Sequence, residues 1–292
     1  MIIVKLMGGL GNQMFQYALG RSLSHKLDVE FKMDLSWFSD APVATTKRNY
    51  ELAAFCIKAS PATSDDLHRL LGAGKSKLMN FMRNLNPFRE KTFVQERWFQ
   101  FDPLILTVQD DVYLEGFWQS EKYFEDVMET LRSEFVLHQS LDDCGCQLES
   151  MIDGSESVSI HFRRGDYVTS ESAKKLHGTC SLDYYRNAIA MLNTRISDPH
   201  FFIFSDDPSW VRNNFSLDFP STFISQSGSR KACDDMHLMS KCRHHILANS
   251  TFSWWGAWLH GGKDNTVVAP KQWFIDGSIN TSDLLPERWI RM

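Results

Sequence analysis

The stretch SIHFRRGDY, residues 159–167, decides the fold of the second half of this 292-residue chain. The apolar run from Val158 to Phe162 is typical of a buried β-strand, and two arginines, a glycine and an aspartate follow it. Adjacent guanidinium groups are costly to bring together unless an anion binds them, and a phosphate or pyrophosphate fits the arginine fork best. The alternative is a surface turn in which Arg164 and Asp166 pair with each other.

Short apolar runs alternate with helical patterns over the whole second half. We expect strands at 158–162, 201–204, 222–225, 245–248 and 266–269, the last being the final strand, and helices at 182–196, from Pro208 onward, at 233–240 and at 252–260. This alternation predicts a parallel sheet with helices on both faces. In such a sheet a ligand binds at the carboxyl ends of the strands.

The first half of the chain is less regular. We expect strands at 2–6, 29–33 and 112–114, and helices at 12–27 and 121–135. The polar stretch 142–157, which contains two glycines, marks the domain boundary. The sequence therefore predicts an α/β protein of two domains, residues 1–150 and 151–292.

The composition excludes several classes of protein. The chain is 43% hydrophobic and 23% charged, with a net charge of -5, which is typical of a globular protein and argues against nucleic-acid binding. No apolar stretch approaches the ~20 residues that cross a bilayer, and the amino-terminal MIIVKL is expected to be a strand of a cytoplasmic protein rather than a signal peptide. The six cysteines lack the paired spacing of a zinc site, so we expect reduced thiols and no bound metal.

The segment 69–91 has an unusual charge distribution. It holds six basic residues and one acid, interleaved with leucines, methionines and phenylalanines. A basic amphipathic segment can contact an anionic membrane surface, and the alternative is a helix packed on the core through its apolar side.

Three further segments carry candidate chemistry. In GGLGNQ, residues 8–13, three glycines in four residues would let a ligand approach the backbone, and Asn12 or Gln13 could point at it. In FIFSDDP, residues 202–208, one of Asp206 and Asp207 caps the next helix. The other aspartate is then left to accept hydrogen bonds from the N–H groups of a ligand such as guanine. Alternatively, the two aspartates together hold a divalent metal.

The third segment is NSTFSWWGAW, residues 249–258, which opens a helix after a strand. Ser250 and Thr251 would form an anion site at the helix start. The tryptophans at 254, 255 and 258 are expected to anchor the helix in the core rather than to stack on a substrate. Taken together, these segments could neutralise a nucleoside diphosphate leaving group without a metal, which indicates an enzyme or binder for a nucleotide-activated molecule.

The segments also resemble, in order, the bacterial α-1,2-fucosyltransferases of glycosyltransferase family 11. The matches lie at 8–18, 116–124, 161–167, 204–207 and 249–259, with Phe117 where the family commonly has tyrosine. The resemblance implies a GT-B fold of two facing Rossmann-like domains, 1–150 on the acceptor side and 151–292 binding GDP-fucose. It also implies transfer of L-fucose from GDP-β-L-fucose to the 2-hydroxyl of a terminal β-galactoside, with inversion and without metal or other cofactor.

The resemblance further implies roles for individual residues. Arg163 would bind the β-phosphate and stabilise the charge that develops as the C1–O bond breaks. Asp166 is the candidate general base, with Glu171 as runner-up, and Arg164 is expected to hold the turn through Asp166. The remaining donor-binding residues would be Asn12, near the fucose or the acceptor; His161 and one of Asp206 and Asp207, facing guanosine; and Ser250, Thr251 and Phe252, contacting the diphosphate.

The same resemblance implies the partners, and three competing functions stay open beside it. The acceptor would be a β-galactoside oligosaccharide or a lipid-linked glycan of O-antigen or capsule synthesis, met at the inner membrane face. One alternative is a transferase for another GDP-sugar. A second is a non-enzymatic carbohydrate-binding module, which would explain the aromatic residues but not the paired arginines. A third is a metal-dependent phosphoryl-handling enzyme built on Asp206 and Asp207, which would lose activity in a chelator.

Overall fold

The computed structural model describes residues 1–40, 48–72, 88, 91–224, 231–262 and 264–292. It divides into two compact units. Unit 1 consists of Met1–Val136 with Asn280–Pro286, and unit 2 of Leu137–Ile279 with Glu287–Met292. Both are α/β units built on a parallel sheet, so the predicted fold class is confirmed.

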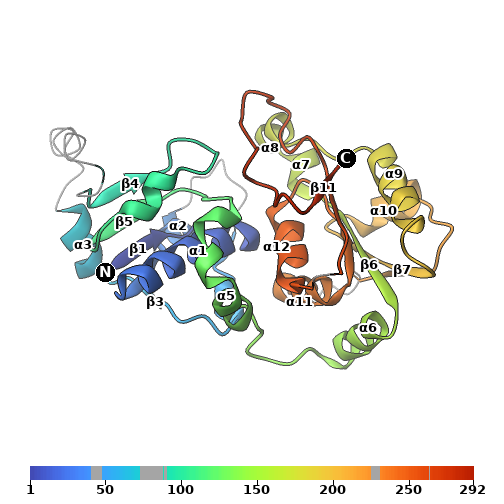
Figure 1. Ribbon diagram of the computed structural model, residues 1–292, viewed down its shortest axis with the longest axis horizontal. Coiled ribbons are helices and arrows are strands. Elements are labelled where there is room, and N and C mark those ends of the chain that lie inside the picture. The colour runs from blue at the N-terminus through green and yellow to red at the C-terminus, as the bar shows by residue number, and fades with distance from the viewer. Residues whose placement is uncertain (41–47, 73–87, 89–90, 225–230, 263) are drawn as a thin grey trace. The chain divides into compact units, whose positions relative to one another are not determined.

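Unit 1 contains a five-stranded parallel sheet of order β3-β2-β1-β5-β4 (Figure 1). The strands are β1 (Ile2–Lys5), β2 (Phe31–Asp34), β3 (Ser60–Pro61), β4 (Phe93–Gln95) and β5 (Val112–Glu115). The α-helices are α1 (Leu10–Leu27), α2 (Ser36–Asp40), α3 (Ser64–Leu71) and α5 (Met128–Glu134). Short 3-10 turns are η1 (Leu52–Ala54), η3 (Pro103–Thr107), η4 (Glu121–Tyr123) and η5 (Glu125–Val127).

The two faces of this sheet are covered by different helices because side chains alternate along each strand. Ile3 and Tyr113 pack against Leu70 of α3 on one face. On the other face α1 comes so close that Gly20 lies directly against Phe31 and Val4. The glycine turn begins after the carboxyl end of β1, the middle strand, and the neighbouring strand β5 ends at the same edge of the sheet.

Unit 2 contains a six-stranded parallel sheet of order β11-β10-β9-β6-β7-β8. The strands are β6 (Glu156–Phe162), β7 (Pro199–Ser205), β8 (Ser221–Phe223), β9 (His244–Ile246), β10 (Val267–Ala269) and β11 (Ile290–Arg291). The chain runs outward from β6 to β8, crosses to the other side of β6 and continues from β9 to β11. This is the strand order of a Rossmann fold, whose topological switch point here lies between β6 and β9.

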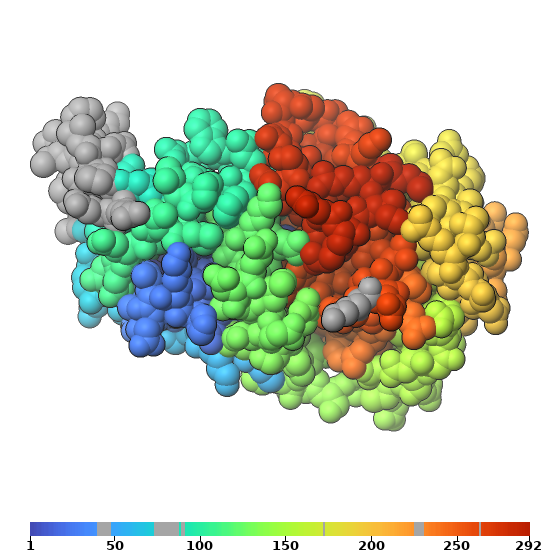
Figure 2. Space-filling view, viewed as in Figure 1, coloured from blue at the N-terminus to red at the C-terminus, as the bar shows by residue number. Residues whose placement is uncertain are grey.

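Helices cover both faces of the second sheet, with α9 and α10 on one side of β6 and β7 and α11 and α12 on the other (Figure 1). The helices are α6 (Asp143–Asp153), α7 (Gly165–Thr169), α8 (Glu171–Leu176), α9 (Leu182–Asn193), α10 (Pro208–Asn214), α11 (Ala232–Lys241) and α12 (Thr251–His260). The yellow residues of α9 form part of the surface of unit 2 in Figure 2. Trp254, Trp255 and Trp258 are buried, which confirms that they anchor α12 in the core.

The division between the units differs from the predicted boundary at residue 150. It falls between Val136 and Leu137, and Asn280–Pro286 returns to unit 1. The polar stretch 142–157 is mostly helix α6, whose Leu148 and Ile152 pack with Phe202 and Leu238 of unit 2. The glycines that suggested a linker lie in the first turn of this helix and at its C-cap.

Two other predictions were wrong in detail. Residues 121–135 do not form one helix: two 3-10 turns precede α5, and Phe124 between them has a non-helical φ of -142°. The strand at 267–269 is not the final one, because β11 pairs with it.

Of the basic segment 69–91, residues 73–87, 89 and 90 lie outside the described part of the chain. In the described part, none of the helices has the length and apolar character needed to cross a membrane.

Candidate functional site

The predicted chemical segments of unit 2 converge at one edge of its sheet. Strand β6 pairs in parallel with β7 on one side and with β9 on the other. The arginine turn after β6, the aspartate pair after β7 and the start of α12 after β9 therefore lie at neighbouring carboxyl ends. This edge contains the switch point, which is where a ligand of an open α/β sheet binds.

Arg163 is held between two carboxylates. Its NH2 group donates to Oδ1 of Asp166 at 2.6 Å, and its NH1 group lies 2.9 Å from Oδ2 of Asp206. Burial lowers the pKa of the guanidinium, but the two carboxylates raise it more, so that it ends above its ordinary value and the group is fully charged. The Nε–H and the second N–H of each terminal nitrogen have no partner among the described residues. These groups remain to bind an anion.

Arg164 does not pair with Asp166, so the predicted role of this arginine in the turn was wrong. Its guanidinium carbon lies 3.5 Å from the ring centroid of Trp210, on α10, in cation–π contact. Its Nε lies 3.6 Å from Oδ2 of Asp207. The two arginines therefore have different environments, and only Arg163 is bound to Asp166.

The two aspartates also divide their roles, but not as expected. Asp207 caps α10 by accepting the N–H of Trp210 at 3.1 Å, which confirms the predicted cap. The sequence left open which aspartate is the cap; with Asp207 in that role, Asp206 would be left for a ligand. Asp206 instead accepts the backbone N–H of Arg164 at 2.8 Å and pairs with Arg163. In the described parts of the chain, no three His, Cys, Asp or Glu side chains are grouped so that they could hold a metal ion.

The first turn of α12 provides N–H groups beside the arginine turn. Ser250 is 5% exposed, and its Oγ accepts the N–H of Phe252 at 3.3 Å, so this hydroxyl caps the helix. Thr251 and Phe252 are half-buried. The positive end of the helix dipole thus lies at the carboxyl end of β9, with Thr251 as the more exposed hydroxyl.

His161, the penultimate residue of β6, is a neutral side chain in this site. It is 4% exposed, and its ring centroid lies 5.5 Å from that of Phe252. Burial, reinforced by the charge of Arg163, lowers the pKa of its imidazole to about 3. Its Nδ1 has no hydrogen-bond partner among the described residues. At neutral pH it can donate or accept a hydrogen bond but carries no charge.

In unit 1 the glycine turn begins α1 two residues earlier than expected, at Leu10. Asn12 is half-buried and its Oδ1 accepts the N–H of Gln119 at 3.1 Å. Gln13, the other residue expected to point at a ligand, is buried and donates to the backbone carbonyls of Gly8 and Asn49. Of these two amides, only Asn12 has the exposure that ligand contact needs.

The loop after β5 completes this edge of unit 1, and sequence reasoning assigned it no role. Trp118 has a φ of +57°, which is uncommon for a residue other than glycine and occurs often at ligand sites. Glu96 fixes this backbone by accepting the N–H groups of Phe117 at 2.7 Å and Trp118 at 3.0 Å. Gln119, which bonds Asn12, is 7% exposed. The match at 116–124 was the only sequence signal for this loop.

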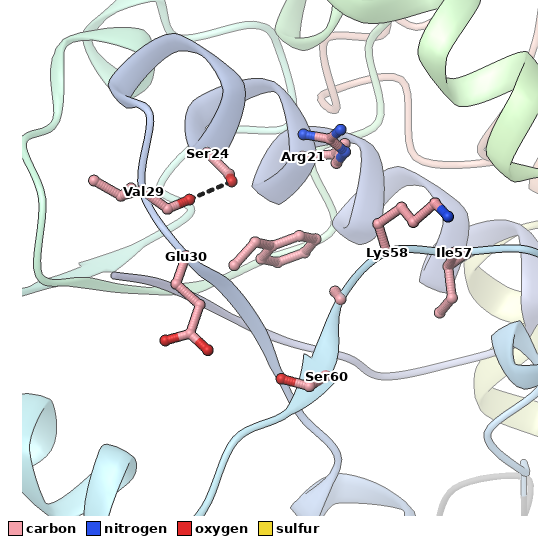
Figure 3. A pocket seen from close by; sticks show the side chains of 9 residues that line it. Arg21, Ser24, Val29, Glu30, Ile57, Lys58 and Ser60 are labelled. Atoms are coloured by element: carbon pink, nitrogen blue, oxygen red, sulfur yellow. Dashed lines mark hydrogen bonds between the residues drawn. The ribbon is translucent and has the colours of Figure 1, made fainter.

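A separate hollow of about 550 Å³ lies in unit 1 (Figure 3). Arg21, Ser24, Glu30, Lys58 and Ser60 are among its lining residues. It opens at the amino ends of β2 and β3, at the opposite edge from Asn12. Because ligands of parallel sheets bind at carboxyl ends, this hollow is not the candidate site.

Comparisons with known proteins agree with this arrangement. The model of "Glycosyl transferase family 11" matches residues 1–291. An alpha-1,2-colitosyltransferase of Escherichia coli is 34% identical, covering 100% of this chain and 98% of the relative. The O-antigen biosynthesis glycosyltransferase WbnK of Escherichia coli is 31% identical, covering 98% and 99%.

More distant similarity extends to eukaryotic proteins. A galactoside alpha-(1,2)-fucosyltransferase 1 of Saimiri sciureus is 29% identical over 51% of this chain and 43% of its own length. A mutant of FUT1 from Arabidopsis thaliana in complex with GDP has a TM-score of 0.51 at 12% identity, covering 91% of this chain and 69% of that one. This structural likeness shows the fold alone, two Rossmann-like units of the GT-B class. The match along the full length is what assigns the protein, and the chain belongs to glycosyl transferase family 11.

Proposed function

We propose that the protein is an inverting glycosyltransferase that moves L-fucose from GDP-β-L-fucose to the 2-hydroxyl of a terminal β-galactoside. The observation that carries this proposal is the juxtaposition of Arg163 and the first turn of α12 at the carboxyl ends of the adjacent strands β6 and β9. A guanidinium with free N–H groups and a helix N-terminus are complementary to a diphosphate.

The diphosphate is bound by directed N–H groups rather than by an excess of positive charge. Asp166 and Asp206 already offset the charge of Arg163. As the C1–O bond breaks, negative charge accumulates on the β-phosphate, and the remaining N–H groups of Arg163 stabilise it. Thr251, Ser250 and the backbone of Phe252 hold the phosphates at the start of α12. No metal is required in this scheme.

Guanosine binds next to the diphosphate in this proposal. His161 offers a neutral imidazole, and Phe252 offers a ring 5.5 Å from it. Of the two aspartates, Asp207 suits the guanine N–H groups better, because its side chain is 39% exposed while Asp206 is bound to Arg163 and to the backbone of Arg164. Asn12, in unit 1, contacts the fucose or the acceptor.

Asp166 is proposed as the base that takes the proton of the acceptor hydroxyl. Its Oδ1 is bound by Arg163, so Asp166 also orients the arginine. Asp166→Asn should reduce transfer strongly while GDP still binds. Full activity of that variant would remove Asp166 as base, and Glu171→Gln, in the exposed first turn of α8, is the matched comparison.

A second donor is favoured by one observation, the 34% identity to a colitosyltransferase over the full chain. Colitose is L-fucose without the 3-hydroxyl. A site that hydrogen-bonds this hydroxyl discriminates strongly against the sugar that lacks it. The ratio of kcat/KM for GDP-fucose and GDP-colitose distinguishes the two: a ratio below one would replace fucose by colitose in the proposal.

The test of the proposed function is release of GDP from GDP-fucose, measured with and without lactose in the presence of EDTA. Release that depends on lactose and survives the chelator is expected. Arg163→Ala should abolish it, whereas Arg186→Ala, which removes an exposed arginine of unit 2 paired with Asp183, should not. If GDP does not bind at all, the proposal is wrong; loss of release in EDTA would favour the metal-dependent alternative.

The natural acceptor is proposed to be a lipid-linked or free oligosaccharide of O-antigen or capsule synthesis, met in the cytoplasm at the inner membrane face. The similarity to an O-antigen biosynthesis glycosyltransferase supports this setting. A membrane contact through 69–91 stays a prediction, testable by co-sedimentation with vesicles that contain anionic lipid.

A further inference from the structure

Tyr167 links the two parts of the anion site in unit 2. Its hydroxyl donates to the backbone carbonyl of Asn249 at 3.1 Å, directly before the first turn of α12. The centroid of its ring lies 5.3 Å from the guanidinium carbon of Arg163. The same ring stacks on His177, with centroids 4.5 Å apart and planes at 2°. One side chain therefore contacts both the arginine turn after β6 and the segment after β9.

The carbonyl that Tyr167 reaches belongs to a firmly held residue. Asn249 is 2% exposed, and its Nδ2 donates to the carbonyls of His177 at 2.9 Å and Trp273 at 3.1 Å. Its Oδ1 accepts the thiol of Cys180 at 3.6 Å. Because Asn249 is tied to these neighbours, its carbonyl is a fixed anchor for the phenol. Burial raises the pKa of Tyr167, so its hydroxyl stays protonated and able to donate.

We propose that Tyr167 is a positioning residue. It fixes the position of the Arg163 guanidinium relative to the first turn of α12, so that both bind the same diphosphate. An arginine side chain loses rotamer entropy when it is held in place, and the carboxylates at the edges of the Arg163 guanidinium do not fix the face that is turned towards the Tyr167 ring. The aromatic face of Tyr167 does so, and the bond to Asn249 fixes the position of that face. This inference rests on the proposed function, in which Arg163 binds the β-phosphate.

The variant Tyr167→Phe keeps the ring and removes only the hydrogen bond to Asn249. Loss of one such bond should weaken GDP binding about five-fold, the scale of a typical hydrogen bond. GMP has no β-phosphate for Arg163 to bind, so its affinity should change by less than about two-fold on the same scale. Titration calorimetry with each nucleotide gives the ratio of GDP affinity to GMP affinity. A general loss of folded protein would not change this ratio.

The matched control is Tyr184→Phe. Tyr184 also donates its hydroxyl to backbone carbonyls of unit 2, those of Leu247 at 2.8 Å and Val268 at 3.2 Å, but its ring contacts Tyr185 rather than an arginine. This variant should lower the melting temperature and leave the ratio of GDP to GMP affinity unchanged. In an Arg163→Ala background, Tyr167→Phe should have no further effect on GDP binding.

The outcomes separate the inference from the proposed function. If the wild-type protein does not bind GDP, the proposed function fails and the inference fails with it. If the wild type binds GDP but Tyr167→Phe binds both nucleotides as well as the wild type, or loses both equally, Tyr167 does not act through Arg163. An additive effect in the Arg163→Ala background would overturn it too. Should Tyr167→Phe fail to fold, Tyr167→His, which retains a flat ring and a ring N–H, undergoes the same titrations.

Discussion

Gly165 determines how closely Asp206 can approach the arginine turn. A Cβ atom at this position would lie 2.5 Å from Oδ2 of Asp206, the oxygen that pairs with Arg163. Asp206 also accepts the backbone N–H of Arg164, so it cannot shift without losing contacts on both sides. The absence of a side chain at Gly165 is therefore part of the site's geometry.

Gly165→Ala should displace the Asp206 carboxylate and loosen Arg163. We expect weaker GDP binding, by about ten-fold, and a stability loss of about 1–3 kcal/mol typical of overpacking. Titration with GDP and thermal unfolding measure the two effects. Gly277→Ala is the matched control, because a Cβ there meets nothing within 4 Å. Normal GDP affinity in Gly165→Ala would show that Asp206 does not orient the arginine.

The amide pair in unit 1 is a second arrangement of single residues with a testable role. Gln119 donates to Oδ1 of Asn12, which leaves the Nδ2 of Asn12 to donate to a ligand. Gln119→Glu cannot donate, so the Asn12 amide should turn over and present an acceptor instead. We expect about ten-fold slower transfer, the scale of one or two lost hydrogen bonds, with unchanged affinity for GDP. The exposed Gln109→Glu carries the same charge change and should behave as wild type; equal losses in both variants would contradict the role.

At the scale of elements, the sequence predicted best those that carry their own pattern. Strand β6 has apolar residues at alternate positions from Val158 to Phe162, and β7 contains the apolar run 201–204. Helix α12 has both a helix start and a closing glycine, Gly261, with φ of +65°. Strands β3 and β11 have two residues each, too few to give a pattern, and pairing with a neighbour defines them. Residues 121–135 were predicted as one helix from apolar spacing, which does not reveal the two 3-10 turns.

Helix α1 depends on Gly20 to reach the sheet. A Cβ there would overlap the ring of Phe31 and lie 2.8 Å from Val4. Although alanine favours a helix over glycine by about 1 kcal/mol, Gly20→Ala should destabilise the protein by about 1–3 kcal/mol. Urea unfolding measures this difference. Gly20→Ala combined with Phe31→Leu should recover part of the loss, and a more stable single variant would refute the close packing.

At the scale of the whole molecule, the sequence predicted which segments of unit 2 meet at one edge of the sheet, but not which side chains pair there. Paired arginines and a Ser–Thr helix start are local signals, and parallel topology implies that they meet at one edge. The partner of each charged group depends on strand register: Phe162 pairs with Ser205, which aligns the arginine turn with Asp206. For this reason Asp206 is bound to Arg163 and is not left for a ligand. The contacts of Tyr167 and Trp210 with the two arginines are likewise visible only in the structure.

Buried histidines should make the stability of the whole chain depend on pH. Burial lowers the pKa of His161 to about 3 and that of His245, assisted by His260 and His244, well below its ordinary value. An unfolded chain protonates these residues near pH 6.5, whereas the folded protein does not, so stability is full above pH 6.5 and is lost as the pH falls towards the folded pKa. Each such histidine contributes a slope of about 1.4 kcal/mol per pH unit below pH 6.5.

Urea unfolding between pH 7.5 and 4.5 tests this expectation, because most carboxylates titrate below that range. His245→Gln should lower stability at pH 7.5 but flatten the slope below pH 6.5 by about 1.4 kcal/mol per unit, since one suppressed protonation is gone. Ser159→Ala removes the hydrogen-bond partner of His245 Nδ1 but keeps the imidazole. It should lower stability by a similar amount at every pH and leave the slope intact. An unchanged slope in His245→Gln would mean that the folded protein already protonates this residue.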